Sequence, residues 1–190
     1  MKNILHFLLL TITFSLFSQD KITDTIQGTK QNLDEVIVQS IRVKYSSPIT
    51  HSNISKTELS LRNLGQDLPI LLNFLPSVVT TSDAGTGVGY TGIRIRGVSA
   101  QSTNITINGI PFNDTESLGT YWVNLPDFTS SIQSLQVQRG VGTSTNGSGA
   151  FGASINILTD DISEDPYAEI SNSIGSYNTY KNTVKFSTGK

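Results

Sequence analysis

The sequence predicts an α+β fold, in which a small domain of mixed strands and short helices is followed by a pair of antiparallel strands. Three observations lead to this class. Residues 92–114 alternate apolar and polar side chains with the period of two that half-buried strands show. The same alternation returns over residues 168–174 and 180–187. Hydrophobic residues make up only 36% and charged residues 15% of the 190-residue chain, a balance that favours short strands and turns over long helices.

The N-terminus reads as an export signal over residues 1–18. Lys2 supplies a positive start, and an apolar stretch from Ile4 to Phe17 follows it. This stretch is shorter than the roughly 20 residues that a membrane-spanning helix needs. A buried core helix is the alternative, but the position at the very start favours export with cleavage after Ser18.

Residues 19–52 read as a polar linker that contains one short strand. Residues 19–32 are polar and aperiodic, which is typical of a segment without its own core. The strand is three β-formers behind two acids, with little nearby to pair with. It comprises Leu33, Asp34, Glu35, Val36, Ile37 and Val38. A strand that pairs with a partner protein and an ordinary edge strand of the domain are the two interpretations.

The next part of the chain, residues 41–60, is expected to continue as a linker into a first strand. A short helix should then begin at Asp67, because an acidic cap followed by Pro69 is a common start. Its buried side would consist of Leu68, Leu71, Leu72 and Leu75. Pro76 should end the helix, and residues 77–81 should be extended.

Residues 92–114 are expected to form two strands joined by a polar loop. In the first strand Ile93 and Ile95 oppose Arg94 and Arg96, and in the second Ile105 and Ile107 oppose Thr106 and Asn108. The loop over residues 99–104 is small and polar. Asn108-Gly109 favours a tight turn, because both residues tolerate positive φ angles.

Two glycine-rich runs match nucleotide motifs only formally. Residues 87–92 fit GxGxxG, but an alternating strand follows where a dinucleotide site needs a helix. Residues 142–148 space their glycines as a P-loop does, but Ser148 stands where the phosphate-binding lysine belongs. No catalytic pair or metal cluster is apparent, cysteine is absent, and His6 and His51 are isolated. The sequence therefore predicts neither an enzyme nor a cofactor.

Several polar and aromatic side chains lie on expected loops and are candidates for contacts with a ligand. They are Tyr90, Ser102, Glu116, Tyr121 and Trp122. For Trp122, packing in the core is the alternative. Further on, residues 132–138 and 151–159 read as strands, and the acidic turn over residues 160–166 is expected to be solvated, since it lacks the spacing of a calcium loop.

Two blocks of sequence carry a family resemblance. Residues 93–97 read IRIRG, and residues 105–112 read ITINGIPF after the polar loop. Residues 125–127 read LPD, and residues 132–157 read IQSLQVQRGVGTSTNGSGAFGASINI. In this order, over about residues 53–158, the blocks resemble the plug domain of TonB-dependent outer-membrane receptors.

The resemblance implies a domain organisation and a membrane. Residues 1–18 would be the signal peptide, 19–52 a periplasmic linker with the TonB box at 33–38, 53–161 the plug, and 162–190 the first hairpin of a truncated transmembrane β-barrel. Apolar side chains on one face of that hairpin, with Glu169, Lys181 and Lys185 on the other, suit a wall between lipid and water. The chain is then the N-terminal part of a longer receptor in the bacterial outer membrane, with the plug inside the barrel and facing the periplasm.

The resemblance also implies partners. Asp34 to Val38 would pair with the periplasmic energy transducer TonB by strand addition. The plug arginines Arg94, Arg96 and Arg139 would pair with carboxylates of the chain's own barrel. The ligand would be a small molecule or metal chelate of the iron-siderophore, haem or vitamin type, because the extra domain and turn of glycan importers are missing. A net charge of −2 gives no reason to expect a nucleic-acid partner.

The alternative function is a secreted β-rich module that binds a ligand or glycan without transport. An export signal, polar composition and aromatic loops suit it equally well. It does not account for the short strand at residues 33–38 or for the order of the two blocks, which favour the transporter.

Overall fold

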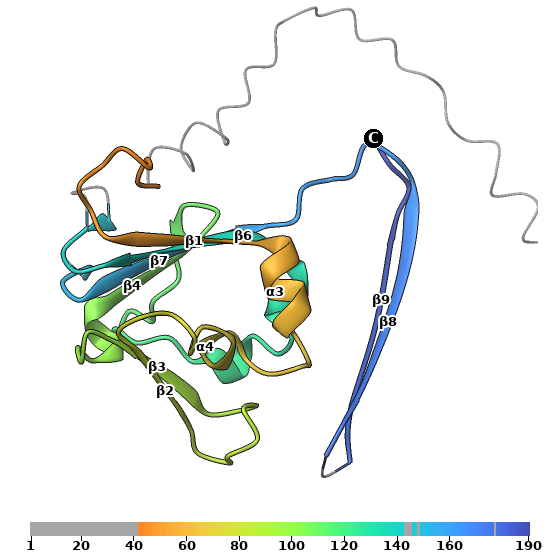
Figure 1. Ribbon diagram of the computed structural model, residues 1–190, viewed down its shortest axis with the longest axis horizontal. Helices are drawn as coiled ribbons and strands as arrows, with labels where there is room; N and C mark the ends of the chain where they lie inside the picture. Colours follow the sequence, from red (N-terminus) through yellow and green to blue (C-terminus); the bar gives the residue numbers. More distant parts are fainter. Residues whose placement is uncertain (1–41, 143–145, 148, 177) are drawn as a thin grey trace, which may run out of the picture. The chain divides into compact units, whose positions relative to one another are not determined.

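Five strands from distant parts of the chain form the central sheet of the computed structural model, which describes residues 42–142, 146–147, 149–176 and 178–190. The strands are β1 (His51–Ser55), β4 (Thr103–Ile107), β5 (Ile110–Pro111), β6 (Ile132–Arg139) and β7 (Ala153–Thr159). Their order in the sheet is β1-β6-β7-β4-β5 (Figure 1). β4 and β7 run parallel and the other pairs antiparallel. This mixed sheet confirms the α+β class.

One face of the sheet carries the hydrophobic core. Leu135 and Val137 of β6 are fully buried, as is Ile155 of β7, and they pack in one cluster with residues of two short helices. These helices, α3 (Lys56–Arg62) and α4 (Leu68–Leu71), lie on the same side of the sheet as the strand pair β2–β3 (Figure 1). Burial of each large aliphatic side chain contributes about 1.5–3 kcal/mol, so this face supplies most of the stability of the domain.

The strand pair β2 (Val78–Ser82) and β3 (Thr91–Ile95) stands apart from the central sheet as an antiparallel pair. Ile93 and Ile95 point into the core while Arg94 is exposed, so the predicted alternation is confirmed as far as Ile95. Arg96 was wrongly predicted to continue the strand, because it lies beyond β3 with a φ of 55°. The predicted tight turn is also present. Ile107 pairs with Ile110 across Asn108 and Gly109, whose φ angles are 49° and 83°.

The helix α4 begins where the sequence predicts. Asp67 holds the N-cap position, and Leu68, Leu71 and Leu72 are buried, but the helix ends at Leu71, before the predicted end at Pro76. However, the Asp67 carboxylate does not cap the helix. It accepts hydrogen bonds from the Gly89 N–H at 3.0 Å and the Thr91 hydroxyl at 2.8 Å, and so it fastens the glycine-rich loop between β2 and β3.

The expectation of a linker over residues 41–60 was wrong for its last part, because α3 starts at Lys56. Ser55 and Glu58 form a reciprocal cap: the Ser55 hydroxyl accepts from the Glu58 N–H, and the Glu58 carboxylate accepts from the Ser55 N–H. The spacing Ser-x-x-Glu in the sequence is the signal of this motif. Leu59 then packs one face of α3 into the core.

An antiparallel hairpin follows the domain. It consists of β8 (Tyr167–Gly175) and β9 (Thr179–Ser187), which confirms both predicted strands. One face carries Ile170 opposite Val184, both about 70% exposed. The other carries Glu169 opposite Lys185. No helix in the part of the chain that the structure describes is long and apolar enough to cross a membrane.

Two further expectations concern residues that the structure does not describe. The leader at residues 1–18 and the coupling strand at residues 33–38 both fall there. Both therefore stay predictions.

Candidate functional site

The ends of two strands bring a pair of arginines together. Arg139 is the last residue of β6, and Arg96 directly follows β3. Arg96 has a φ of 55° and lies against Gly140, where an added Cβ would come within 2.6 Å of its Nη1 atom. The φ of 98° favours glycine at position 140, whereas the contact alone would be relieved by a shift of the flexible Arg96 side chain.

The electrostatics agree that the two guanidinium groups are neighbours. Partial burial lowers the pKa of Arg139, and the positive charge of Arg96 lowers it further. The Arg139 Nη1 atom donates a long hydrogen bond of 3.5 Å to the Pro76 carbonyl oxygen. A neutral carbonyl at this distance offsets little of the repulsion between two like charges.

No carboxylate faces this arginine pair within the described residues. The ion pairs found there all use lysines, namely Lys56, Lys181 and Lys185. Arg94 lies on the exposed face of β3, opposite Val79, and within the described residues no hydrogen bond joins it to Arg96 or Arg139. The structure thus brings two of the three predicted arginines together and leaves the third apart.

The candidate ligand residues fall into three groups. Ser102 closes a 3-10 turn, η2 (Ala100–Ser102), and its carbonyl oxygen accepts from the Gly152 N–H. Tyr121 and Glu116 are exposed on the loop that follows β5. Tyr90 is 67% exposed at the end of the glycine-rich loop.

Trp122 is a correction, because its side chain is only 3% exposed and belongs to the core cluster. It begins the short 3-10 helix η3 (Trp122–Asn124). A buried indole packs against the domain and presents no surface to a ligand. Of the two roles that the sequence left open for Trp122, packing in the core is therefore the correct one.

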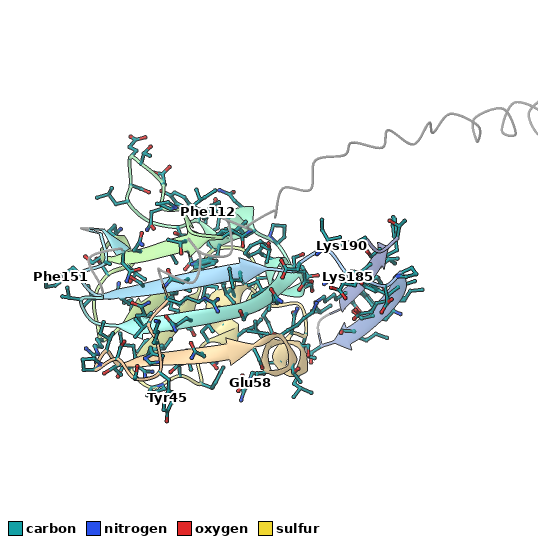
Figure 2. All side chains as sticks on the ribbon, turned by 90° about the horizontal axis from the view of Figure 1, so that it is seen from above. Tyr45, Glu58, Phe112, Phe151, Lys185 and Lys190 are labelled. Atoms are coloured by element: carbon teal, nitrogen blue, oxygen red, sulfur yellow. The ribbon has the colours of Figure 1, made fainter. Side chains whose placement is uncertain are left out.

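The loop after β5 is held in shape by two side chains. The Asn113 amide accepts from the Ile105 N–H and donates to the carbonyl oxygens of Thr103 and Leu118. Asp114 accepts from the N–H groups of Glu116 and Ser117. Figure 2 shows Phe112 where this loop leaves the β5 edge of the sheet. The loop and Ser102 therefore lie at the same end of β4.

The sequence did not predict two ion pairs between the hairpin and the domain. Lys181 lies 2.7 Å from an oxygen of Asp127, and Lys185 lies 3.2 Å from an oxygen of Asp160. Asp160 also pairs with Lys56 at 2.7 Å. The first residue of the acidic turn is thus paired with lysines rather than solvated. The available signal was the spacing of Lys181 and Lys185, which places both cations on one face of a strand.

Both aspartates have pKa values below their ordinary value. Burial alone would raise the pKa of Asp127, but hydrogen bonds from Lys181 and Ser130 and the charge of Lys181 outweigh it. Burial would likewise raise the pKa of Asp160, but hydrogen bonds and charges from Lys56 and Lys185 outweigh it and lower the pKa. In the residues that the structure covers, no group of three or more carboxylate, imidazole or thiol side chains is placed to hold a metal ion.

A family model and several known proteins match this chain. Residues 43–154, more than half of the chain, match the TonB-dependent receptor plug domain. The chain is 29% identical over 147 residues to a probable TonB-dependent siderophore receptor, PirA, of Acinetobacter baumannii, which covers 72% of this chain and 18% of that protein. It is 31% identical over 132 residues to the vitamin B12 transporter BtuB of Vibrio vulnificus, with coverage of 68% and 21%.

A solved structure shows the same fold. The FpvA protein of P. aeruginosa, in a complex with a heterologous pyoverdine and iron, superposes with a TM-score of 0.60 at 17% identity, over 74% of this chain and 18% of that one. The chain spans about a fifth of the length of the relatives that it matches. The match over residues 43–154 and the mixed sheet agree with the resemblance found in the sequence. The chain belongs to the TonB-dependent receptor plug domain family.

Proposed function

We propose that the chain is the plug part of a TonB-dependent transporter that takes up a scarce nutrient across the bacterial outer membrane. The observation that carries this proposal is the plug match over residues 43–154, in a domain with the fold of such receptors. The match favours a transporter over a secreted binding module. In this role the plug binds and gates, and it catalyses no reaction.

The arginine pair supports a place for this domain inside a barrel. Arg96 and Arg139 are close together, with no carboxylate partner in the described part of the chain. Two neighbouring guanidinium groups require anionic partners when water is excluded from them. Carboxylates on the inner wall of the proposed barrel would supply them, with the bidentate geometry that arginine favours. Arg94 would form a separate pair.

The hairpin also supports the placement of this domain inside a barrel, because the hairpin resembles part of a barrel wall. Its polar face meets the domain through Lys181 and Lys185, and its apolar face points away, with Phe186 81% exposed. A strand of a transmembrane barrel has this division, apolar toward lipid and polar toward the lumen. We infer that β8 and β9 are the first strands of that barrel.

The ligand class follows from the relatives and from the exposed loops. PirA is a siderophore receptor by name and BtuB a vitamin B12 transporter. We infer a ligand of the iron-siderophore, haem or vitamin type, which reaches the plug at Tyr90, Ser102, Glu116 and Tyr121. The last of these offers a half-exposed aromatic ring on a loop that Asn113 and Asp114 hold in place.

Energy for uptake would enter at residues 34–38. An extended strand that pairs with the transducer TonB needs backbone N–H groups, and proline has none. Val36→Pro should therefore abolish energised uptake in the full receptor, whereas Val36→Ile keeps the donor and should retain most activity. Binding of the ligand at the cell surface should be equal in both variants, because this segment faces the other compartment.

The experiment measures surface binding and accumulation separately. Radiolabelled ferric siderophores, haem and cyanocobalamin serve as probes, in cells whose only copy of the receptor carries each variant. The expected result is binding without accumulation for Val36→Pro and both for Val36→Ile. Equal accumulation in Val36→Pro and wild type would contradict the proposal, as would the absence of accumulation of any probe above cells without the gene.

A further inference from the structure

The second face of the central sheet is polar and buried, and one short segment of chain is attached to it. Gln136 and Gln138 of β6 are 2% and 0% exposed, on the face opposite the core residues Leu135 and Val137. Residues 42–43 lie against this face, with Val43 only 6% exposed. This segment closely follows the proposed coupling strand at residues 34–38. Its attachment to the sheet therefore affects how that strand is connected to the plug domain.

The Gln136 side chain holds Val43 at two points. Its carbonyl oxygen accepts from the Val43 N–H at 2.7 Å, and its amide nitrogen donates to the Val43 carbonyl oxygen at 2.9 Å. The nitrogen also donates to Asn53 at 2.7 Å, and the oxygen also accepts from Gln138 at 2.9 Å. A primary amide offers two donors and two acceptor positions, so Gln136 uses all of its hydrogen-bonding capacity here.

Arg42 adds a second attachment beside this one. Its guanidinium donates to the hydroxyl and the carbonyl oxygen of Ser134, both at 3.0 Å, and to the Asn156 carbonyl oxygen at 3.2 Å. These acceptors are neutral, and within the described residues the buried Nε atom has no hydrogen-bond partner. When Arg42 leaves the sheet, its guanidinium charge regains its hydration by water, which offsets part of the cost of breaking these hydrogen bonds. The attachment therefore has a specific geometry but a low free-energy cost of opening.

Chain length shows what the attachment controls. From Val38 to Arg42 the chain reaches at most about 14 Å. Within the described residues, the next hydrogen bond to the sheet is made by Thr50, whose carbonyl oxygen accepts from the Arg139 N–H just before β1. Between them, Ser47 bonds only locally to Lys44, and Tyr45 is 95% exposed; Figure 2 shows Tyr45 pointing away from the sheet. Release of residues 42–43 would extend the reach from Val38 to roughly 40 Å.

We propose that Gln136 is a positioning residue for coupling: it clamps Val43 to the sheet and thereby sets how far the coupling strand extends from the plug. While Gln136 holds Val43, a pulling force on residues 34–38 is transmitted to the domain at β6. With it open, the strand gains about 26 Å of reach. This inference rests on the proposed function of that strand, but the clamp itself is measurable without transport.

The first measurement is trypsin cleavage of the purified full receptor. Cleavage after Arg42 requires its side chain to leave the sheet, whereas Lys44 is exposed in either state and serves as the internal reference. Gln136→Met keeps the side-chain length and removes both bonds to Val43, so cleavage after Arg42 should rise about tenfold. Gln133→Met is the matched control, because Gln133 is exposed on the same strand. It should leave cleavage unchanged.

A second variant guards against a folding defect. Arg42→Lys keeps the trypsin site but loses the planar guanidinium that reaches Ser134 and Asn156, so cleavage after residue 42 should rise relative to cleavage after Lys44 without any change in the sheet. Unchanged cleavage after residue 42, relative to Lys44, in both Gln136→Met and Arg42→Lys would overturn the clamp.

The second measurement is capture of the transducer. A cysteine at Gln39 of the full receptor, in cells without ligand, should form a disulfide with a cysteine in the transducer severalfold more often when Gln136 is Met. Faster cleavage without increased capture would overturn the role in reach. A normal clamp together with unimpaired uptake in Val36→Pro would instead contradict the proposed function, so the two failures are distinguishable.

Discussion

At the scale of single residues, Arg96 and Arg139 show how backbone conformation places a charge. Arg96 adopts a φ of 55°, which is uncommon for a residue with a side chain, and Gly140 leaves space for its guanidinium. The left-handed backbone conformations of Arg96 and Gly140 bring the end of β3 close to the end of β6, beside Arg139.

The arginine pair leads to the first prediction at this scale. If Arg96 and Arg139 share one set of barrel carboxylates, replacement of either by Met should weaken the hold on the plug by about 3–5 kcal/mol, since it leaves a buried charge unpaired. The double variant should cost clearly less than the sum of the two, because neighbouring residues that share a partner are not additive. Amide protection of the plug in the full receptor measures each cost.

Arg94 provides the comparison. It is exposed on β3 and has no contact with the pair, so Arg94→Met combined with Arg139→Met should be additive within about 0.5 kcal/mol. Additivity of Arg96→Met with Arg139→Met would show that the two arginines act at separate sites.

At the scale of elements, α3 depends on a local signal and can be tested by it. The helix has seven residues, too few to be stable without its cap and the packing of Leu59. Ser55→Ala removes the acceptor for the Glu58 N–H and should cost about 1 kcal/mol. The loss should appear as faster amide exchange at Leu59 and Asn63 in the intact protein.

Ser60 is the matched control for this prediction, because it is a serine on the exposed side of the same helix. Its hydroxyl donates to the Thr57 carbonyl oxygen, a bond that adds little to helix stability. Ser60→Ala should change the free energy of opening by less than about 0.5 kcal/mol. Equal effects of Ser55→Ala and Ser60→Ala would show that the cap does not hold α3.

The strands also show which features of the fold a local sequence pattern can predict. Strands β3, β8 and β9 could be predicted because each has one apolar face, and alternation records that directly. The strand at β6 could be predicted too, but not the burial of Gln136 and Gln138. That burial depends partly on residues 42–43, more than ninety positions earlier in the chain, and no local pattern encodes such a contact.

The candidate site was predictable to the same extent. Residue types and blocks of sequence pointed to the arginines and to the loops. The closeness of Arg96 to Arg139, the burial of Trp122 and the pairing of Asp160 all arise from tertiary packing. A single Trp in a polar loop has the same sequence signature whether it faces a ligand or the core, so the sequence left both alternatives open.

At the scale of the whole molecule, positive charge is used in two ways. Arg96 and Arg139 have no ion pair with a carboxylate within the described residues, whereas the hairpin lysines Lys181 and Lys185 are paired with aspartates of the domain. Inside a barrel the two arrangements would be complementary, with cations from the plug on one side of the contact and cations from the wall on the other. Pairing in both directions fixes the plug more specifically than either alone.

The lysine pairs make the attachment of the hairpin dependent on pH. The pKa values of Asp127 and Asp160 are lowered in the folded protein, because hydrogen bonds and charges from the lysines outweigh the effect of burial. Their stabilisation is therefore fully present above the ordinary aspartate pKa of about 3.9 and is lost as the pH falls through the lower folded value. Since both pairs are partly exposed, together they should contribute about 1 kcal/mol.

Spin labels on cysteines at Leu61 of α3 and Asn172 of β8, both exposed, measure this attachment in the intact protein. The distance distribution should be narrow at pH about 6 and broaden as the pH falls below the ordinary aspartate pKa of about 3.9, while circular dichroism shows that the sheet is retained. A variant with Asp127→Asn and Asp160→Asn should give the broader distribution already at pH about 6, because neither amide carries the charge that the lysines bind. Asp161→Asn, a neighbouring exposed carboxylate, should behave as wild type. A distribution that stays narrow in the double variant would show that packing, and not these ion pairs, holds the hairpin against the domain.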